Sequence, residues 1–161
     1  MTDDTFTHTK KKRDLREHIL YRMSLYSTIA ERNGKVYFTK RFGLSLREYR
    51  ILGVVSYMQP VSVMALSDEC YLDKGQVSRV VSKLEAAGYV ERNADADPSA
   101  RGGKLALTAA GSDLVEQGLA YSDDLHARAM SVLSPEERDA FSNSLDRLLG
   151  RIREIHSEVH D

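Results

Sequence analysis

The chain has 161 residues, with 23 Lys and Arg against 24 Asp and Glu and a formal net charge of −1. This length is typical of one domain, or of one subunit with an appended arm, and no apolar run approaches the ~20 residues of a membrane-spanning helix. The polar stretch from Met1 to Arg13 does not resemble a signal peptide and the single cysteine, Cys70, excludes a framework of intrachain disulfides, so we expect a cytoplasmic protein with no membrane partner.

The charges are distributed unevenly along the chain. Residues 1–50 carry a net charge of +6, residues 51–108 a net charge of −1, and residues 109–161 a net charge of −6. The two ends are complementary, although individual surface ion pairs contribute only ~0–1 kcal/mol. Any affinity for a polyanion must therefore come from local groups of positive charge and not from a global field.

Two helices are predicted before residue 60. The first covers about residues 10–32, where apolar residues share one side of a helix: Leu15, Ile19, Met23, Tyr26 and Ala30. The second begins at Ser45, because Ser45 and Glu48 have the spacing of a capping box, in which each side chain bonds the backbone of the other residue. Its inward positions are Leu46, Tyr49, Leu52 and Val55.

Two short helices joined by a tight turn follow. Ser62 is a good N-cap for the first, whose apolar positions are Val63, Leu66 and Cys70. Tyr71 and Leu72 lead into Asp73, which caps the second helix, with Gln76 three residues later as in a capping box. The second helix has an apolar stripe of Val77, Val80, Val81 and Leu84, and an opposite face of Gly75, Arg79 and Ser82 flanked by Gln76, Ser78 and Lys83. This order predicts a helix-turn-helix.

A β-hairpin is predicted directly after these helices. Gly88 stands where a helix end favours a left-handed residue. The segments Tyr89 to Arg92 and Leu105 to Leu107 alternate enough to pair as strands. The loop from Asn93 to Gly103 is rich in turn-forming residues, and Arg101 and Lys104 lie at its tip.

The exposed face of the second short helix carries residue types that read DNA. Arg pairs with guanine, Gln with adenine, and Ser bonds base edges or phosphates. Gly75 costs roughly 1 kcal/mol of helix stability relative to Ala, and close approach of a DNA strand is one reason to tolerate it. Arg101 at the hairpin tip suits a narrow minor groove or its phosphates. The alternative interpretation of this face is an ordinary solvated surface.

The last third of the chain predicts two further helices. Thr108 begins a long helix with Leu114, Leu119, Leu125 and Met130, and Ser134, Pro135 and Glu137 form a strong start for another. In that last helix the apolar residues have the spacing of a heptad seam: Phe141, Leu145, Leu148, Ile152, Ile155 and Val159. Such a seam needs a partner, so we expect a homodimer whose two reading helices lie one DNA turn, ~34 Å, apart.

Five segments together have a recognisable pattern: Leu44–Leu52, Ser62–Leu66, Leu72–Val81, Leu84–Arg92 and Leu105–Gly111. Over about residues 44–111 the chain resembles the MarR family of bacterial winged-helix transcription regulators. The family's reading helix usually begins Asp-Arg-x-x-Val-x-Arg, so Lys74 stands where Arg is common and Arg79 falls on the shared Arg. The family's wing usually carries Asp-x-Arg. Arg101 matches that Arg, whereas Ser99 replaces the Asp and Asp97 lies two residues earlier.

The resemblance implies a mainly α (α+β) fold in one subunit, with a winged helix-turn-helix lobe over about 44–111 and dimerisation helices over about 10–43 and 112–161. It implies a sequence-specific, homodimeric regulator of transcription, a repressor that binds a near-palindromic double-stranded operator and is released by a small-molecule effector. An aromatic or acidic effector would bind between the arms and the lobe, against Arg22, Tyr26 and Tyr49, for which core packing is the alternative. The expected DNA contacts are Ser62, Lys74, Gly75, Gln76, Ser78, Arg79, Lys83 and Arg101.

Two other functions stay open on the sequence. A winged-helix protein-interaction module would account for the weak positive charge, and a redox-responsive regulator would act through Cys70, which falls on an apolar stripe and is expected to be buried. His156 and His160 have a metal-capable spacing but no clear third ligand, so we expect neither metal nor cofactor. There is no nucleophile–base set, P-loop or dinucleotide fingerprint, and we expect no enzyme.

Overall fold

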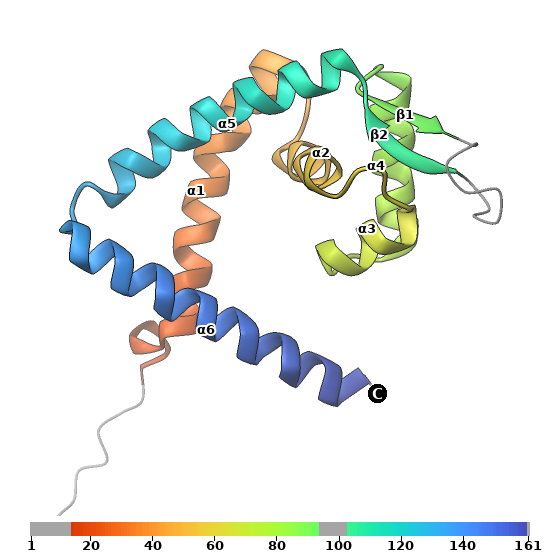
Figure 1. The fold of residues 1–161 in the computed structure, drawn as a ribbon. Coiled ribbons are helices and arrows are strands. Elements are labelled where there is room, and N and C mark those ends of the chain that lie inside the picture. The colour runs from red at the N-terminus through yellow and green to blue at the C-terminus, as the bar shows by residue number, and fades with distance from the viewer. Residues whose placement is uncertain (1–13, 94–102, 161) are drawn as a thin grey trace, which may run out of the picture. The chain divides into compact units, whose positions relative to one another are not determined.

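The computed structural model describes residues 14–93 and 103–160, without the side chain of His160. The predicted fold class, mainly helical with a small antiparallel wing, is confirmed (Figure 1). The elements are a short 3-10 helix η1 (Leu15–Glu17), α1 (Ile19–Phe42), α2 (Leu46–Met58), α3 (Val63–Cys70), α4 (Lys74–Ala86), β1 (Val90–Asn93), β2 (Lys104–Leu107), α5 (Ala109–Met130) and α6 (Pro135–His160). The chain divides into two compact units, residues 1–112 and 113–161.

The first unit contains a continuous apolar core around α2. This helix contacts α1, α3, α4 and β2, and it begins with the predicted capping box, in which the Ser45 hydroxyl accepts the Glu48 amide and the Glu48 carboxylate accepts the Ser45 amide. Burial of apolar side chains is the main stabilising contribution to such a core. The largest fully buried side chains are Phe38, Ile51, Leu52, Val55, Leu66, Val77, Val81, Leu84 and Leu105.

Helix α1 lies further along the chain than the sequence predicted: it begins at Ile19 and ends at Phe42, in place of about residues 10–32. Gly34 lies inside the helix at the contact with α2. A Cβ placed on Gly34 would lie 3.5 Å from Leu46 Cδ2, an ordinary van der Waals distance, so α1 and α2 are in contact at this point. Beyond it, the Phe38 ring stacks on the Tyr49 ring with centroids 4.1 Å apart. Gly43, with a φ of 67°, ends the helix.

The helix-turn-helix and the hairpin are confirmed, with small shifts in their bounds. Gly88 has a φ of 76°, and the Gly88 and Tyr89 amides donate to the Glu85 and Leu84 carbonyls at 2.9 and 3.0 Å, the double bond of a Schellman cap. Strands β1 and β2 pair antiparallel with Val90 opposite Leu107, one residue away from the predicted start of the first strand. Figure 1 shows the hairpin beside α4.

A third short segment joins the hairpin and was not predicted. Val61 pairs with Leu105 through two backbone hydrogen bonds of 3.0 and 2.8 Å. In addition, the Gln59 side-chain oxygen accepts the Leu107 amide at 2.8 Å. These contacts attach β2 to the segment between α2 and α3, and they hold the wing to the helix-turn-helix.

The start of α5 is anchored to the end of α4. The Thr108 hydroxyl donates to the Gly88 carbonyl at 2.7 Å and accepts the Gly111 amide at 3.0 Å. Gly111 contacts the Tyr89 backbone so closely that a Cβ on it would lie 2.0 Å from the Tyr89 carbonyl oxygen. Only glycine therefore fits at this position of α5.

The second unit contains the rest of α5 and all of α6. The predicted start of α6 is confirmed, since Ser134 and Glu137 form both bonds of a capping box at 2.8 and 3.3 Å. Leu119 of α5 is 52% exposed. Among the helices that the structure describes, none has the length and apolar character that crossing a bilayer requires.

Candidate nucleic-acid interface

The start of α4 is fixed by Asp73. The Asp73 carboxylate accepts the Gly75 amide at 2.8 Å and the Gln76 amide at 3.2 Å. A Cβ on Gly75 would lie 3.0 Å from the same carboxylate oxygen, which gives this glycine a local reason besides the close approach of a partner. Asp73 therefore satisfies two of the free amides in the first turn of α4.

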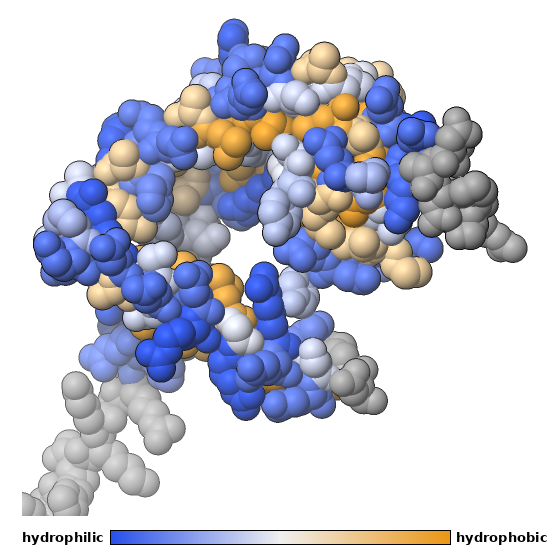
Figure 2. Space-filling view, viewed as in Figure 1, coloured by the Kyte–Doolittle hydropathy of each residue, from blue (hydrophilic) through white to orange (hydrophobic). Residues whose placement is uncertain are grey.

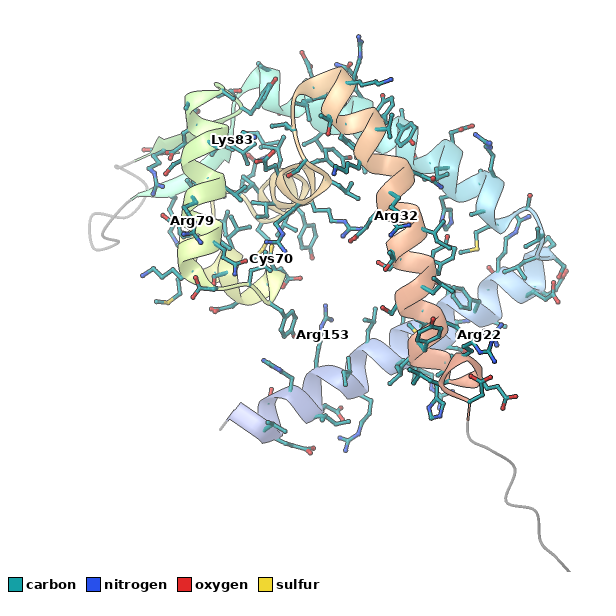
Figure 3. All side chains as sticks on the ribbon, turned by 180° about the vertical axis from the view of Figure 1, so that it is seen from behind. Arg22, Arg32, Cys70, Arg79, Lys83 and Arg153 are labelled. Carbon is teal, nitrogen blue, oxygen red and sulfur yellow. The ribbon has the colours of Figure 1, made fainter. Side chains whose placement is uncertain are left out.

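The two faces of α4 differ as the sequence predicted. Val77, Val81 and Leu84 are fully buried, whereas Lys74, Gly75 and Arg79 are exposed and Ser78 is half-buried. Within residues 14–93 and 103–160, the side chains of Lys74, Ser78 and Arg79 make no hydrogen bond or ion pair. Figure 3 shows Arg79 and Lys83 on this helix. Three polar side chains are thus available to bind a partner.

Gln76 has a partner that the sequence did not predict. The Gln76 amide oxygen accepts a hydrogen bond from Arg47 Nη1, on α2, at 3.1 Å, and no bond from Gln76 back to Asp73 completes the expected capping box. The expectation of a reciprocal box was therefore wrong, because the Gln76 side chain bonds across to the neighbouring helix. A hollow of about 250 Å³ lies here, lined by Arg47, Ile51, Leu72, Gln76, Arg79 and Val80.

Lys83 is paired with Glu48 across the same two helices. Its ammonium lies 2.8 Å from Glu48 Oε1, while Glu48 Oε2 accepts the Ser45 amide at 2.7 Å. Burial alone would raise the pKa of Glu48, but the hydrogen bonds from Lys83 and Ser45 outweigh it and lower the pKa. A phosphate that binds Lys83 must therefore share the ammonium with a carboxylate.

The remaining predicted DNA contacts lie at α3 and at the wing. Ser62 caps α3, with its hydroxyl accepting the Ala65 amide at 3.2 Å. Arg101 falls outside the described residues, so its expected place in a minor groove stays a prediction. The described part of the hairpin is attached to α4 by Arg92, whose guanidinium lies 2.6 Å from Glu85 Oε1.

The predicted effector residues do not form one cluster within the first unit. Tyr49 is buried against Phe38, whereas Arg22 is exposed and Tyr26 is 58% exposed on α1. Because Tyr26 and Phe38 are twelve positions apart on one helix, they are separated by about 18 Å along its axis. Arg50 of α2 has its Nη1 atom 2.6 Å from Glu31 Oε1 of α1.

Cys70 lies at the end of α3 and is only half-buried. Burial raises the pKa of its thiol, and the neighbouring Glu69 carboxylate raises it further. A higher pKa lowers the fraction of thiolate, which is the form that oxidants attack, so this environment does not favour a redox switch.

Within the part of the chain that the structure describes, no three His, Cys, Asp or Glu side chains are grouped for a metal ion.

Similar sequences and structures are found among known proteins. A family model described as the MarR family matches residues 42–100. The transcriptional regulator SarZ of Staphylococcus saprophyticus is 30% identical over 49% of this chain and 53% of its own length, so the chain spans about half of that curated relative. The structure of a MarR/EmrR family regulator from Acinetobacter sp. ADP1 is 25% identical with a TM-score of 0.77, over 88% of this chain and 99% of that one.

A third similar structure was solved with DNA. It is the MepR–DNA complex of S. aureus, which is 19% identical with a TM-score of 0.73 over 86% of this chain and 99% of that one. At this identity the likeness shows the fold alone.

The helix-turn-helix, the two-stranded wing attached to it and the polar face of α4 define a winged-helix protein. Over residues 42–100 the chain matches the MarR family model, and its fold is that of MarR-family structures. The curated relative and the solved structure that it resembles are both named as transcriptional regulators.

Proposed function

We propose that this protein is a sequence-specific DNA-binding regulator of transcription. The observation that carries the proposal is the exposed face of α4, where Lys74, Ser78 and Arg79 have no partner among the described residues. The same fold was solved on DNA in MepR. An α-helix with such a face fits the major groove, where Arg and Lys bond guanine and Ser bonds base edges or phosphates.

The proposed contacts divide into two kinds. Lys74, Gln76, Ser78 and Arg79 would reach base edges, with Gly75 allowing close approach of the backbone. Phosphates would be held by Ser62, at the start of α3, and by Lys83, while the wing residue Arg101 would enter the minor groove. Contacts of the first kind give specificity and those of the second kind fix the position of the protein on the duplex.

We further propose a homodimer that represses transcription in the cytoplasm. Support comes from α6, whose heptad seam is exposed within the single chain: Phe141 is 47% and Ile152 57% exposed. An apolar seam that is left in water favours association with a second copy. In the proposed arrangement α1, α5 and α6 form the dimerisation arm, and two copies of α4 bind a near-palindromic operator.

We also propose that a small aromatic or acidic effector releases the protein from DNA. This part of the proposal rests on the resemblance to the MarR family. Such a ligand would bind one dimer geometry better than the other and shift the population away from the DNA-binding form. Since Tyr49 packs against Phe38, Arg22 and Tyr26 are the more accessible of the three candidate residues.

Selection of binding sites from a random duplex library tests the proposal. We expect the purified protein to enrich a near-palindromic sequence, and Arg79→Ala to enrich it weakly or not at all. Failure of the folded wild-type protein to enrich any sequence would contradict DNA recognition. Capture of a specific protein partner, in place of DNA, would then support the interaction module.

A further inference from the structure

The contact between Arg47 and Gln76 fixes the direction of a side-chain amide. A guanidinium only donates hydrogen bonds, so the atom of Gln76 that faces Arg47 must be the amide oxygen. The two residues are 29 positions apart in the sequence and join α2 to α4 with an N···O distance of 3.1 Å. The amide nitrogen of Gln76, with its two N–H donors, occupies the other arm of the planar group.

The surroundings of this contact limit how Gln76 can turn. Both residues line one hollow of about 250 Å³, with Ile51, Leu72 and Val80 as its apolar part and Arg79 as a second guanidinium. A glutamine that pairs with adenine must use its oxygen as an acceptor and its nitrogen as a donor at once. Here positive charge lies against that oxygen, which disfavours a further donor such as adenine N6.

We propose that Arg47 is a positioning residue for base recognition, which holds the Gln76 amide so that its N–H donors face the base edge. This inference rests on the proposed function. It assigns Gln76 a preference for guanine, whose O6 and N7 are both acceptors in the major groove, over adenine, which presents a donor at N6. Arg47 would then contribute to specificity through Gln76, without contacting a base itself.

The test uses the full-length protein and the DNA site that selection yields. Binding is measured by fluorescence anisotropy on duplexes that carry every single base-pair change, for the wild type, Gln76→Ala, Arg47→Ala and the double variant. Loss of preference in Gln76→Ala identifies the base pair that Gln76 reads. We expect guanine there in the wild type, and a reduction of that preference by about tenfold in Arg47→Ala, with no further loss in the double variant.

Three results would overturn the inference. A wild-type preference for adenine at the Gln76 base pair would show that the amide faces the base the other way. Equal weakening of Arg47→Ala on all duplexes, with the Gln76 preference intact, would show that Arg47 binds a phosphate. A wild-type protein that binds all duplexes equally would overturn the proposed function and, with it, this inference.

A second arginine variant on α2 serves as the control for indirect effects of Arg47→Ala. Arg50→Ala removes a guanidinium from the same helix, but Arg50 pairs with Glu31 on α1 and not with α4. We expect its base preference at the Gln76 pair to equal that of the wild type. An equal loss of preference in Arg50→Ala and Arg47→Ala would mean that the loss comes from the removed charge or from altered packing of α2. That result would contradict a positioning role for Arg47.

Discussion

Arg79 lies on the exposed face of α4 and makes no hydrogen bond or ion pair with a described residue. Its removal leaves no buried partner unsatisfied, so we expect Arg79→Ala to fold normally and to lose about 1–3 kcal/mol of DNA-binding free energy, with relaxed specificity at one base pair. Competition binding on the selected site measures the loss. Arg147→Ala, which removes an exposed arginine from α6, is the control and should leave binding within twofold, about 0.4 kcal/mol; an equal loss in both variants would indicate a non-specific charge effect.

Glu48 links two structural features, the cap of α2 and the ion pair to Lys83 on α4. Its pKa is lowered in the folded protein, so its stabilising effect is complete above the ordinary glutamate pKa of ~4.3 and is lost as the pH falls through the folded value. We expect Glu48→Gln to lower the free energy of unfolding by about 1–2 kcal/mol at pH 7.

Denaturant unfolding at several pH values checks this expectation. The difference between Glu48→Gln and the wild type should shrink as the pH falls below ~4.3. A difference that stays constant down to the acid range would contradict a role for the ionised carboxylate.

At the scale of the elements, the joint between the wing and α5 depends on Gly111. Any side chain there would overlap the Tyr89 carbonyl, since even a Cβ would lie 2.0 Å from its oxygen. We expect Gly111→Ala to lower the free energy of unfolding by about 3 kcal/mol. Gly150→Ala is a matched control in α6, where nothing lies within 4 Å of the added carbon, and it should raise stability by about 0.5–1 kcal/mol. Equal effects in chemical denaturation would contradict the close contact.

The elements that the sequence predicted well are those with local signals. The N-caps at Ser45, Asp73 and Ser134, and the left-handed glycine at position 88, are recognised from neighbours within a few residues and are confirmed. Of the three expected capping boxes, the one at Asp73 does not form, because Gln76 bonds Arg47. The predicted end of α1 was wrong, since beyond residue 32 the helix packs Gly34 and Phe38 against α2, and such tertiary contacts have no local signature.

The candidate site was predicted in part for the same reason. The apolar stripe of α4 predicted which side of the helix is buried, and therefore that Arg79 and Lys74 lie on the exposed side. The contacts that modify this face, Arg47 with Gln76 and Glu48 with Lys83, join residues 29 and 35 positions apart. No pattern in a single sequence pairs them, since each depends on how α2 and α4 pack.

For the whole molecule, the proposed dimer accounts for α6. Five of its six seam residues are exposed in the single chain, Ile152 among them, and Leu145 is half-buried. Figure 2 shows in orange where apolar side chains reach the visible surface. A carboxylate in the middle of an apolar interface would be buried without a partner, so we expect Ile152→Glu to sediment as a monomer or to dimerise at least 100-fold more weakly, about 2.7 kcal/mol.

The control for the dimer is a carboxylate on the same helix but off the seam. Asn143 is exposed and lies outside the heptad positions, so Asn143→Glu should sediment as the wild type does. Wild-type protein that stays monomeric at micromolar concentration, or Ile152→Glu that stays dimeric, would contradict association through α6.

DNA recognition through α4 is the central claim, and one measurement tests it most directly. Fluorescence anisotropy of the wild-type protein is recorded on its selected duplex and on a scrambled duplex of equal length, at two salt concentrations. We expect the selected duplex to bind roughly 10³-fold tighter or better, with an affinity that falls with salt by the amount that a few phosphate contacts per subunit imply. Equal affinity for the two duplexes at both salt concentrations would contradict the claim.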